Sequence, residues 1–411
     1  MVTYPNDWDV RSIGEFVHVG RGASPRPIEA FLTTSIDGVN WIKIGDAPRY
    51  GKYITQTAEK VTQDGAARSV RVNAGDFILS NSMSFGRPYI LTIDGCIHDG
   101  WLRLYDYQDS VDKEFLYYVL SSEETKKQYA TFAAGSGVQN LNKTVVKKVV
   151  VHLPTIPEQK RIAKVLSEMD EHIDNLAELI EKKKGIRDGA LEDLLSGRTR
   201  LSGFQDDWVE VPLVDALREK VKIGPFGSQL KKETLLTQGE YKVYGQENIY
   251  ARNFQIGDRY LIKEHFDRLS SCEIVPGDFL MSTMGTIGKC AIAPQGIKKG
   301  IMDSHLIRFR INEDILLPEY LLQLFSENYT FLSKQTERLA VGGIMDGLSV
   351  GIVNQLMLLM PSNINEQKAI ANTLIAMDNE IIVLEDERNK MIQIREGAMD
   401  DLLSGRVRLP M

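Results

Sequence analysis

Residues 158–201 read EQKRIAKVLSEMDEHIDNLAELIEKKKGIRDGALEDLLSGRTRL, and residues 366–409 read EQKAIANTLIAMDNEIIVLEDERNKMIQIREGAMDDLLSGRVRL. Aligned without a gap at an offset of 208, the two stretches are identical at 23 of 44 positions. Self-similarity at a fixed period marks a repeated structural unit. The 411-residue chain is therefore predicted to consist of two halves of the same design.

Each repeated stretch is predicted to be one long helix. Thr155 to Glu158 and Asn363 to Glu366 have the spacing of capping boxes, and Gly197 and Gly405 stand where a glycine ends a helix. Apolar residues recur at alternating steps of four and three, the pattern of a coiled-coil seam. The pseudo-two-fold duplication predicts that the two helices pack antiparallel. The seam residues are Ile162, Leu166, Met169, Ile173, Leu176 and Ile180 in the first copy, and Ile370, Leu374, Met377, Ile381 and Leu384 in the second.

The segments that precede the helices resemble each other only in outline. Asp7-Trp8 matches Asp207-Trp208, and GDFILS at 75–80 matches GDFLMS at 277–282. Short apolar runs between turn residues predict α/β (α+β) domains with irregular, loop-rich sheets. We divide the chain into a domain at 1–153, a helix at 154–201, a domain at 202–360 and a helix at 361–411. Expected strands are 77–80, 101–105, 147–153 and 306–311, and expected helices are 113–121 and 318–328.

Composition limits the class of protein. Three widely spaced cysteines, with no histidine at ligand spacing, suggest neither a disulfide framework nor a metal site. No stretch approaches the roughly 18 apolar residues that span a bilayer, so we expect a cytoplasmic protein without a membrane partner. The net charge of −7 argues against a simple nucleic-acid binder, because phosphate contacts usually leave a basic footprint. If DNA is bound, basic residues must gather on one face or a partner must supply phosphate contacts.

Two divergent segments alternate with two helices that begin Glu-Gln-Lys and end Asp-Leu-Leu-Ser-Gly-Arg. This order resembles the specificity subunit of type I restriction-modification systems over essentially the whole chain. The stretches GRGASPRPI, WIKIGDA and GDFILSNSMSFGRP in the first domain are similar to the recognition-domain outline of that family. So are GPFGSQLKK, YKVYGQENIY and GDFLMSTMGTIGK in the second domain.

The resemblance implies a function. Each divergent segment would be a target-recognition domain that reads one half of a bipartite site in double-stranded DNA. The helices would act as a spacer and would hold two adenine-methylating modification subunits, which in turn join restriction subunits. S-adenosylmethionine would be bound by the modification subunit and not by this chain.

The sequence contains no recognisable catalytic motif. An amino-methyltransferase needs an (Asp/Asn)-Pro-Pro-aromatic element, and the sequence contains no Pro-Pro. The stretch from Gly285 to Cys290 has the wrong glycine spacing for a phosphate-binding loop. The six histidines form no recognisable set of nucleophile, base and orienting group. We therefore predict a subunit without catalytic residues.

The predicted DNA-binding residues are side chains on loops that suit base edges: arginine or lysine for guanine, asparagine or glutamine for adenine, and serine or threonine for either. A solvated turn is the alternative for each of them. They are Arg21, Ser24, Arg26, Asn81, Ser84, Arg87, Gln139 and Asn140 in the first domain, and Ser228, Gln229, Lys231, Thr283, Thr286, Lys289 and His305 in the second.

The two ends of each repeat are the predicted partner-binding positions, since they are identical in both copies. They are Glu158, Gln159, Arg198 and Arg200, with Glu366, Gln367, Arg406 and Arg408. A helix cap followed by a surface arginine is the simpler interpretation of the Ser-Gly-Arg ends. For the whole chain, the alternative function is a coiled-coil scaffold whose globular domains bind proteins.

Overall fold

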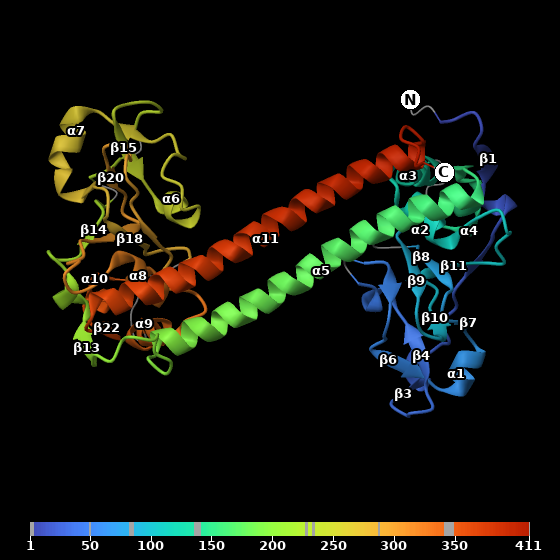
Figure 1. The fold of residues 1–411 in the computed structure, drawn as a ribbon, viewed down its shortest axis with the longest axis horizontal. Coiled ribbons are helices and arrows are strands. Elements are labelled where there is room, and N and C mark those ends of the chain that lie inside the picture. Colours follow the sequence, from blue (N-terminus) through green and yellow to red (C-terminus); the bar gives the residue numbers. More distant parts are fainter. Residues whose placement is uncertain are drawn as a thin grey trace. The chain divides into compact units, whose positions relative to one another are not determined.

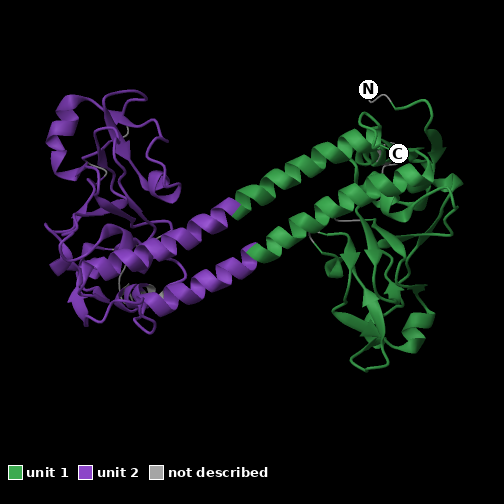
Figure 2. Cartoon of the chain, in the orientation of Figure 1, with its two compact units in different colours: residues 1–179, 384–411 green, residues 180–383 purple. Residues whose placement is uncertain are grey.

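The computed structural model describes residues 4–48, 51–81, 86–134, 141–226, 229–231, 235–286, 288–340 and 349–410. The chain forms two compact units (Figure 2). The first contains residues 1–179 and 384–411, and the second contains residues 180–383. The sequence-based division placed boundaries at the ends of the long helices, whereas the compact units divide within both helices.

The two repeated stretches form the long helices α5 (Ile156–Leu195) and α11 (Ile364–Ser404), drawn in green and red in Figure 1. Both end as predicted. Gly197 has a φ of 73° and Gly405 a φ of 71°, the left-handed region that glycine adopts without steric cost. Each glycine lies against a tryptophan of its own unit. A Cβ at Gly197 would lie 3.2 Å from the Trp208 ring, and one at Gly405 would lie 3.1 Å from the Trp8 ring.

Inside each unit the two helix segments run antiparallel, as predicted. In the first unit Arg395 of α11 donates to Asp170 of α5, with Nε and Oδ1 2.9 Å apart. In the second unit Arg187 of α5 donates to Asp378 of α11 over 2.8 Å. The predicted seam residues are turned inward: Ile162, Leu166, Leu176, Ile180, Ile370, Leu374 and Ile381 are buried, and Met169, Ile173, Met377 and Leu384 are half-buried.

The first domain contains two five-stranded sheets and a two-stranded sheet, with strand orders β2-β11-β8-β9-β5, β3-β6-β4-β10-β7 and β1-β12. The strands are β1 (Asp9–Ser12), β2 (His18–Arg21), β3 (Leu32–Thr33), β4 (Val39–Ile42), β5 (Tyr53–Ile54), β6 (Glu59–Val61), β7 (Val70–Val72), β8 (Phe77–Ser80), β9 (Pro88–Leu91), β10 (Gly95–Ile97), β11 (Trp101–Tyr105) and β12 (Val150–Leu153). The short helices are α1 (Gln63–Ala67), α2 (Lys113–Ser121), α3 (Glu123–Ala134) and α4 (Lys143–Lys148).

The second domain repeats this topology with fewer edge strands. Its strand orders are β14-β21-β18-β19, β16-β15-β20-β17 and β13-β22. The strands are β13 (Trp208–Pro212), β14 (Lys222–Ile223), β15 (Tyr241–Tyr244), β16 (Tyr260–Leu261), β17 (Glu273–Ile274), β18 (Phe279–Ser282), β19 (Cys290–Ile292), β20 (Gly300–Met302), β21 (Leu306–Phe309) and β22 (Met357–Pro361). The helices are α6 (Gln246–Tyr250), α7 (Lys263–Arg268), α8 (Pro318–Leu324), α9 (Thr330–Ala340) and α10 (Val350–Val353).

The long helices supply part of each domain's core. Ile162, Leu166, Met399 and Leu402 belong to the same buried cluster as Phe115 of α2. Leu191, Leu194, Ile370 and Leu374 belong to the cluster that contains Tyr320 of α8. Burying apolar area against another element stabilises a helix more than its intrinsic propensity does. Each domain is therefore completed by segments of both repeats.

Three of the predicted elements have different bounds. Residues 147–153 are not one strand, because Asn142 caps a helix that runs to Lys148, its side chain accepting from the Val145 amide over 3.0 Å. The strand begins only at Val150. The helix predicted over 318–328 ends at Leu324. The strand predicted over 306–311 ends at Phe309, and Ile311 forms an isolated bridge to Leu217.

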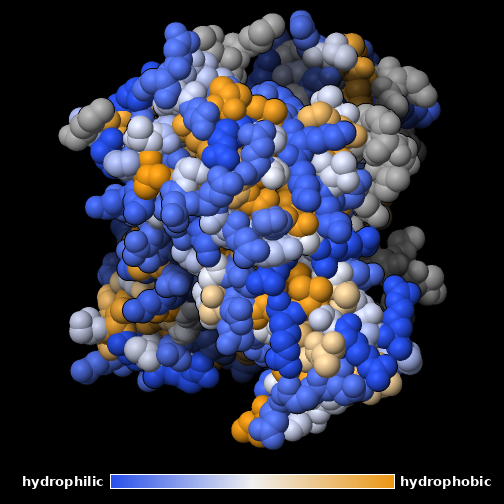
Figure 3. Space-filling view, turned by 90° about the vertical axis from the view of Figure 1, so that its right-hand side faces the viewer, coloured by the Kyte–Doolittle hydropathy of each residue, from blue (hydrophilic) through white to orange (hydrophobic). Residues whose placement is uncertain are grey.

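The space-filling view of the face in Figure 3 shows hydrophobic residues in small groups between hydrophilic ones. Small, separated apolar groups are normal on the surface of a folded protein. Within the described part of the chain, no helix combines the length and the apolar character needed to cross a membrane.

Candidate nucleic-acid interface

In the first domain, side chains from two segments, residues 21–26 and Asn81, converge on the turn between β10 and β11. Ser24 donates to the Asp99 carboxylate over 2.8 Å. Arg21 Nε and Asn81 Nδ2 donate to the Asp99 main-chain oxygen over 2.9 and 2.7 Å. Arg26 lies 3.5 Å from the second carboxylate oxygen. Hydrogen bonding from Ser24 contributes most to lowering the pKa of Asp99. We call this arrangement the Asp99 hub.

In the second domain, the turn before β21 occupies the position that the turn between β10 and β11 has in the first. The Gly224 amide donates to Leu306 O over 3.0 Å, and the Thr283 amide donates to His305 O over 2.9 Å. These bonds match those from Gly22 to Trp101 and from Asn81 to Gly100 in the first domain. The carboxylate of this turn belongs to Asp303, which is bound by Arg259 with Nη1 and Oδ2 2.9 Å apart. We call this arrangement the Asp303 hub.

A glycine is required where the first loop of each domain crosses this turn. A Cβ on Gly22 would overlap the His98 carbonyl, and a Cβ on Gly224 would overlap the Asp303 carbonyl. Real side chains do not approach a main-chain oxygen so closely, so any substitution must move one of the two segments. The crossing fixes the exposed residues that follow each glycine relative to the hub.

A hairpin loop of the same construction borders each hub. Ser80 Oγ accepts from the Arg87 amide, and Ser282 Oγ accepts from the Lys289 amide, both over 3.1 Å. Gly86 and Gly288 have φ values of 76° and 80°. The serine at the end of the strand therefore fixes the start of β9 or β19 in both domains, while the residues between differ in sequence.

The ends of the repeats are joined by ion pairs that cross between copies. Arg200, at the end of the first repeat, holds Glu366, at the start of the second, with N–O distances of 2.5 and 2.7 Å. Arg408 holds Glu158 in the same way over 2.5 and 2.8 Å. Arg408 also binds Asp7, and the hydrogen bond from Arg408 is the main cause that lowers the pKa of Asp7.

Comparison with known proteins identifies the fold. A family model described as "Type I restriction modification DNA specificity domain" matches residues 5–183 and 218–393. The chain belongs to this family. It is therefore a specificity subunit of the type I restriction-modification class, and sequence specificity toward DNA is the role of that class.

Three similar proteins match the chain over almost its whole length. The type I restriction enzyme MjaVIII specificity subunit of Methanocaldococcus jannaschii is 24% identical over 98% of this chain and 94% of its own length. The solved S subunit of the type I restriction-modification system of M. genitalium has a TM-score of 0.56 at 17% identity, with both chains fully covered. A chain from a structural study of complex assembly in the type I R-M system has a TM-score of 0.61 at 14% identity, over 98% of this chain and all of that one. These two likenesses show the fold of the specificity subunit.

The structure brings four of the fifteen predicted DNA-binding residues of this specificity subunit together at one turn. Arg21, Ser24, Arg26 and Asn81 meet at the Asp99 hub. Arg87 is half-buried, with its guanidinium 5.2 Å from the centre of the Tyr89 ring. Ser84, Gln139, Asn140 and Ser228 lie outside the described residues.

In the second domain, the predicted residues are less uniform. Thr283 is buried and His305 half-buried at the Asp303 hub, where the His305 amide donates to Asp303 over 3.0 Å. Thr286 is exposed, and its amide donates to Tyr250 Oη over 3.1 Å. Lys289 forms an ion pair with Glu327. Gln229 and Lys231 are exposed on the loop that follows the glycine crossing.

The predicted partner-binding residues separate into two groups. Glu158, Gln159, Glu366 and Gln367 are buried, and Arg200 and Arg408 are committed to the two glutamates. The glutamate–arginine bonds join the two repeats within each unit, and the two glutamines bond to main-chain groups of the domain beside them. The four buried side chains are therefore not open to a partner as the sequence led us to expect, whereas Arg408 is exposed while it binds Glu158. Arg198 and Arg406 are exposed and contact only acidic residues of their own repeat among the described residues. They stay predicted partner-binding residues.

The capping-box interpretation was also wrong for the two glutamates, whose carboxylates accept from arginines of the opposite repeat.

Sequence reasoning missed Asp99, Asp303 and Arg259, because nothing local marks a carboxylate on which distant loops converge. It also missed the pairs Asp170–Arg395 and Arg187–Asp378. Their signal was present: both residues of each pair are identical at the offset of 208.

Proposed function

We propose that this chain is the DNA-recognition subunit of a type I restriction-modification complex and that each domain reads one half of a bipartite site. The observation that carries the proposal is the repeated hub. Two domains with different loop sequences use the same glycine crossing and the same turn to hold polar side chains at one place. A shared frame with different loops is what two independent base-reading surfaces need.

The side chains at the hubs fit the chemistry of base and phosphate recognition. Arg21 and Arg26 are exposed and offer bidentate donors, and half-buried Ser24 adds a small polar group. Asn81 is buried and supports the hub through its bond to Asp99 O. In the second domain Gln229, Lys231 and Thr286 are exposed. The net charge of −7 is compatible with DNA binding if bound modification subunits contribute phosphate contacts, since those contacts supply much of the affinity.

In this proposal the chain acts without a catalytic centre of its own. Two modification subunits bind S-adenosylmethionine and methylate adenine, and restriction subunits join through them. The pseudo-two-fold duplication supports a two-to-one ratio, because a repeated surface binds a repeated partner.

The test is an exchange of domains in the complete system, read by sequencing methylated DNA from the host. Wild-type protein should give one motif made of two defined parts and an unspecified gap. Replacing residues 1–150 with the corresponding domain of another specificity subunit should change one part only. The reciprocal control, exchange of the second domain, should change the other part. A motif in which both parts change after a single exchange would refute independent reading.

A further inference from the structure

The strand that leads into each long helix has an outer edge closed by glutamine side chains. Gln128 of α3 pairs with both main-chain groups of Val150, over 2.8 and 2.9 Å. Four residues further on, Gln159 donates to Pro154 O over 2.8 Å. The carboxamides thus take the place of a neighbouring strand at the two ends of this edge.

The second unit repeats this edge. Gln335 of α9 pairs with both main-chain groups of Met357 over 3.0 Å, and Gln367 donates to Pro361 O over 2.9 Å. Because main-chain groups alternate in direction along a strand, the residue between the two closed positions faces the same outer side. That residue is Leu359 in the second unit and His152 in the first.

The pairing register confirms this orientation. The Ile13 amide donates to Val149 O, so the hydrogen-bonded pairs between β1 and β12 are those of Val149, Val151 and Leu153. The amide and carbonyl of His152 therefore point away from β1. Among the described residues no hydrogen bond reaches them, and the same holds for Leu359. Each edge consequently has one open position between two closed ones.

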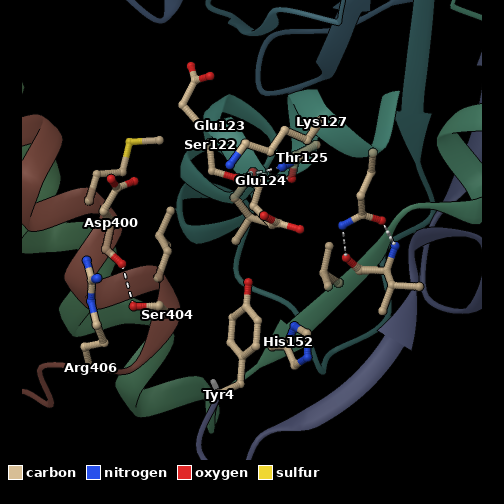
Figure 4. A pocket seen from close by; sticks show the side chains of 16 residues that line it. Tyr4, Ser122, Glu123, Glu124, Thr125, Lys127, His152, Asp400, Ser404 and Arg406 are labelled. Atoms are coloured by element: carbon tan, nitrogen blue, oxygen red, sulfur yellow. Dashed lines mark hydrogen bonds between the residues drawn. The ribbon is translucent and has the colours of Figure 1, made fainter. Parts of the chain in front are cut away.

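A groove lies beside each open position. The first has a volume of about 160 Å³ and the second about 470 Å³. Figure 4 shows the first, between α3, β12 and the end of α11. Eight residues that line the second groove have a counterpart lining the first at an offset of 207 or 208. They are Glu192, Ser196, Tyr329, Phe331, Lys334, Gln335, Met357 and Leu359, opposite Asp400, Ser404, Ser122, Glu124, Lys127, Gln128, Val150 and His152.

Both grooves also retain a lysine that the fold does not require. Helices α3 and α9 read EETKKQYATFAA and TFLSKQTERLA, which differ at most aligned positions but share the Lys-Gln pair. The glutamine has a structural task at the strand edge. Lys127 and Lys334 are exposed at the groove and have no such task. An acidic residue, Asp400 or Glu192, comes from the long helix in each groove.

We propose that each groove receives a short extended segment of a modification subunit, which forms one β-bridge with His152 or Leu359 and places an acidic side chain on Lys127 or Lys334. This inference rests on the proposed function, because it assigns the two grooves to two copies of one partner. Main-chain pairing at a strand edge supplies affinity without depending on side chains. Such pairing explains why the apolar walls of the two grooves differ, although each groove keeps an open strand edge, a lysine and an acidic residue.

Charge reversal tests the lysines. Native mass spectrometry of the assembled complex should give two modification subunits for the wild type and one for Lys127→Glu or Lys334→Glu. The double variant should bind both copies at least tenfold more weakly, because a glutamate would repel the acidic side chain. Lys113→Glu and Lys263→Glu, on exposed lysines away from the grooves, are the matched controls and should keep two copies. Two copies bound at wild-type affinity by the double variant would overturn the lysine contact.

Hydrogen exchange tests the bridge independently of any substitution. On addition of the modification subunit, the amides of His152 and Leu359 should exchange at least tenfold more slowly, while those of solvent-exposed loops stay unchanged. Unaltered exchange at both amides in an assembled complex would overturn the bridge and leave the proposed function standing. A wild-type chain that binds no modification subunit would instead refute the proposed function.

Discussion

The Arg200 guanidinium holds the carboxylate of Glu366, which lies 166 residues later in the chain, with Nε and Oε1 2.5 Å apart. The Arg408 and Glu158 side chains repeat the arrangement over a separation of 250 residues. Glu366 is fully buried and Glu158 nearly so. In each compact unit the end of one repeat is thus bound to the start of the other.

The first prediction concerns this pair. Arg200→Met should lower the midpoint of thermal unfolding by more than about 5 °C, because the buried Glu366 carboxylate loses the arginine that compensates its charge. Adding Glu366→Gln to Arg200→Met should restore part of the loss, since the uncompensated charge is then gone. Scanning calorimetry would measure both. Arg198→Met, two residues away on an exposed arginine, is the control and should unfold near the wild-type temperature.

The second prediction concerns the glycine crossing. Gly22→Ala should weaken recognition of one half-site at least tenfold, because its Cβ would overlap the His98 carbonyl and displace the loop that carries Ser24 and Arg26. Gly224→Ala should do the same to the other half-site. Gly45→Ala adds a methyl group to open space in the first domain and should leave the motif intact. Binding of the complex to oligonucleotides altered in one half-site would measure the effect, and equal weakening at both half-sites by Gly22→Ala would contradict it.

The third prediction concerns the exposed arginines of the repeat ends. Reversing both charges, with Arg198→Glu and Arg406→Glu, should weaken assembly with the modification subunit more than it weakens DNA readout. Mass photometry of the complex gives the subunit ratio and the affinity. If both equal those of the wild type, these arginines are not part of the docking surface.

The fourth prediction treats the paired helices as a spacer. Inserting four residues between Leu176 and Ile180, and four at the equivalent point of α11, adds about one helical turn and keeps the apolar seam nearly in phase. The added length is at most about 6 Å, so the gap between half-sites should grow by about one or two base pairs. Inserting two residues turns the seam by roughly 200° and should abolish packing. Sequencing of methylated sites would measure the gap, and an active four-residue variant with the original gap would show that the helices do not set it.

Much of the architecture was predictable because the repeats carry it. The alternating steps of four and three identified both helices, and Gly197 and Gly405 identified where they end. Helix α2 was predicted with its observed bounds, and the structure shows that Asp112 caps it. Strands of two or three residues were not predictable. Their apolar pattern is too short to separate from a turn, and the cap at Asn142 converted part of an apparent strand into α4.

The hubs illustrate what sequence cannot supply. Arg21, Ser24, Arg26 and Asn81 were predicted by residue type, but their meeting point at Asp99 depends on a loop crossing between residues about 75 positions apart. The buried roles of Glu158 and Gln159 were missed for a different reason. Identity between the copies marks both internal contacts and partner contacts, and only the three-dimensional pairing separates them.

The first unit includes residues 384–411, and this determines when its core can be completed during synthesis. Met399 and Leu402 belong to the core of the first domain, although they follow the whole second domain in the sequence. Nascent domains usually fold in order from the N-terminus, but this one keeps an unfilled apolar face until Met399 and Leu402 have been synthesised. A chain terminated before Met399 would expose that face to chaperones and proteases, so the first domain closes only after the second domain has been synthesised.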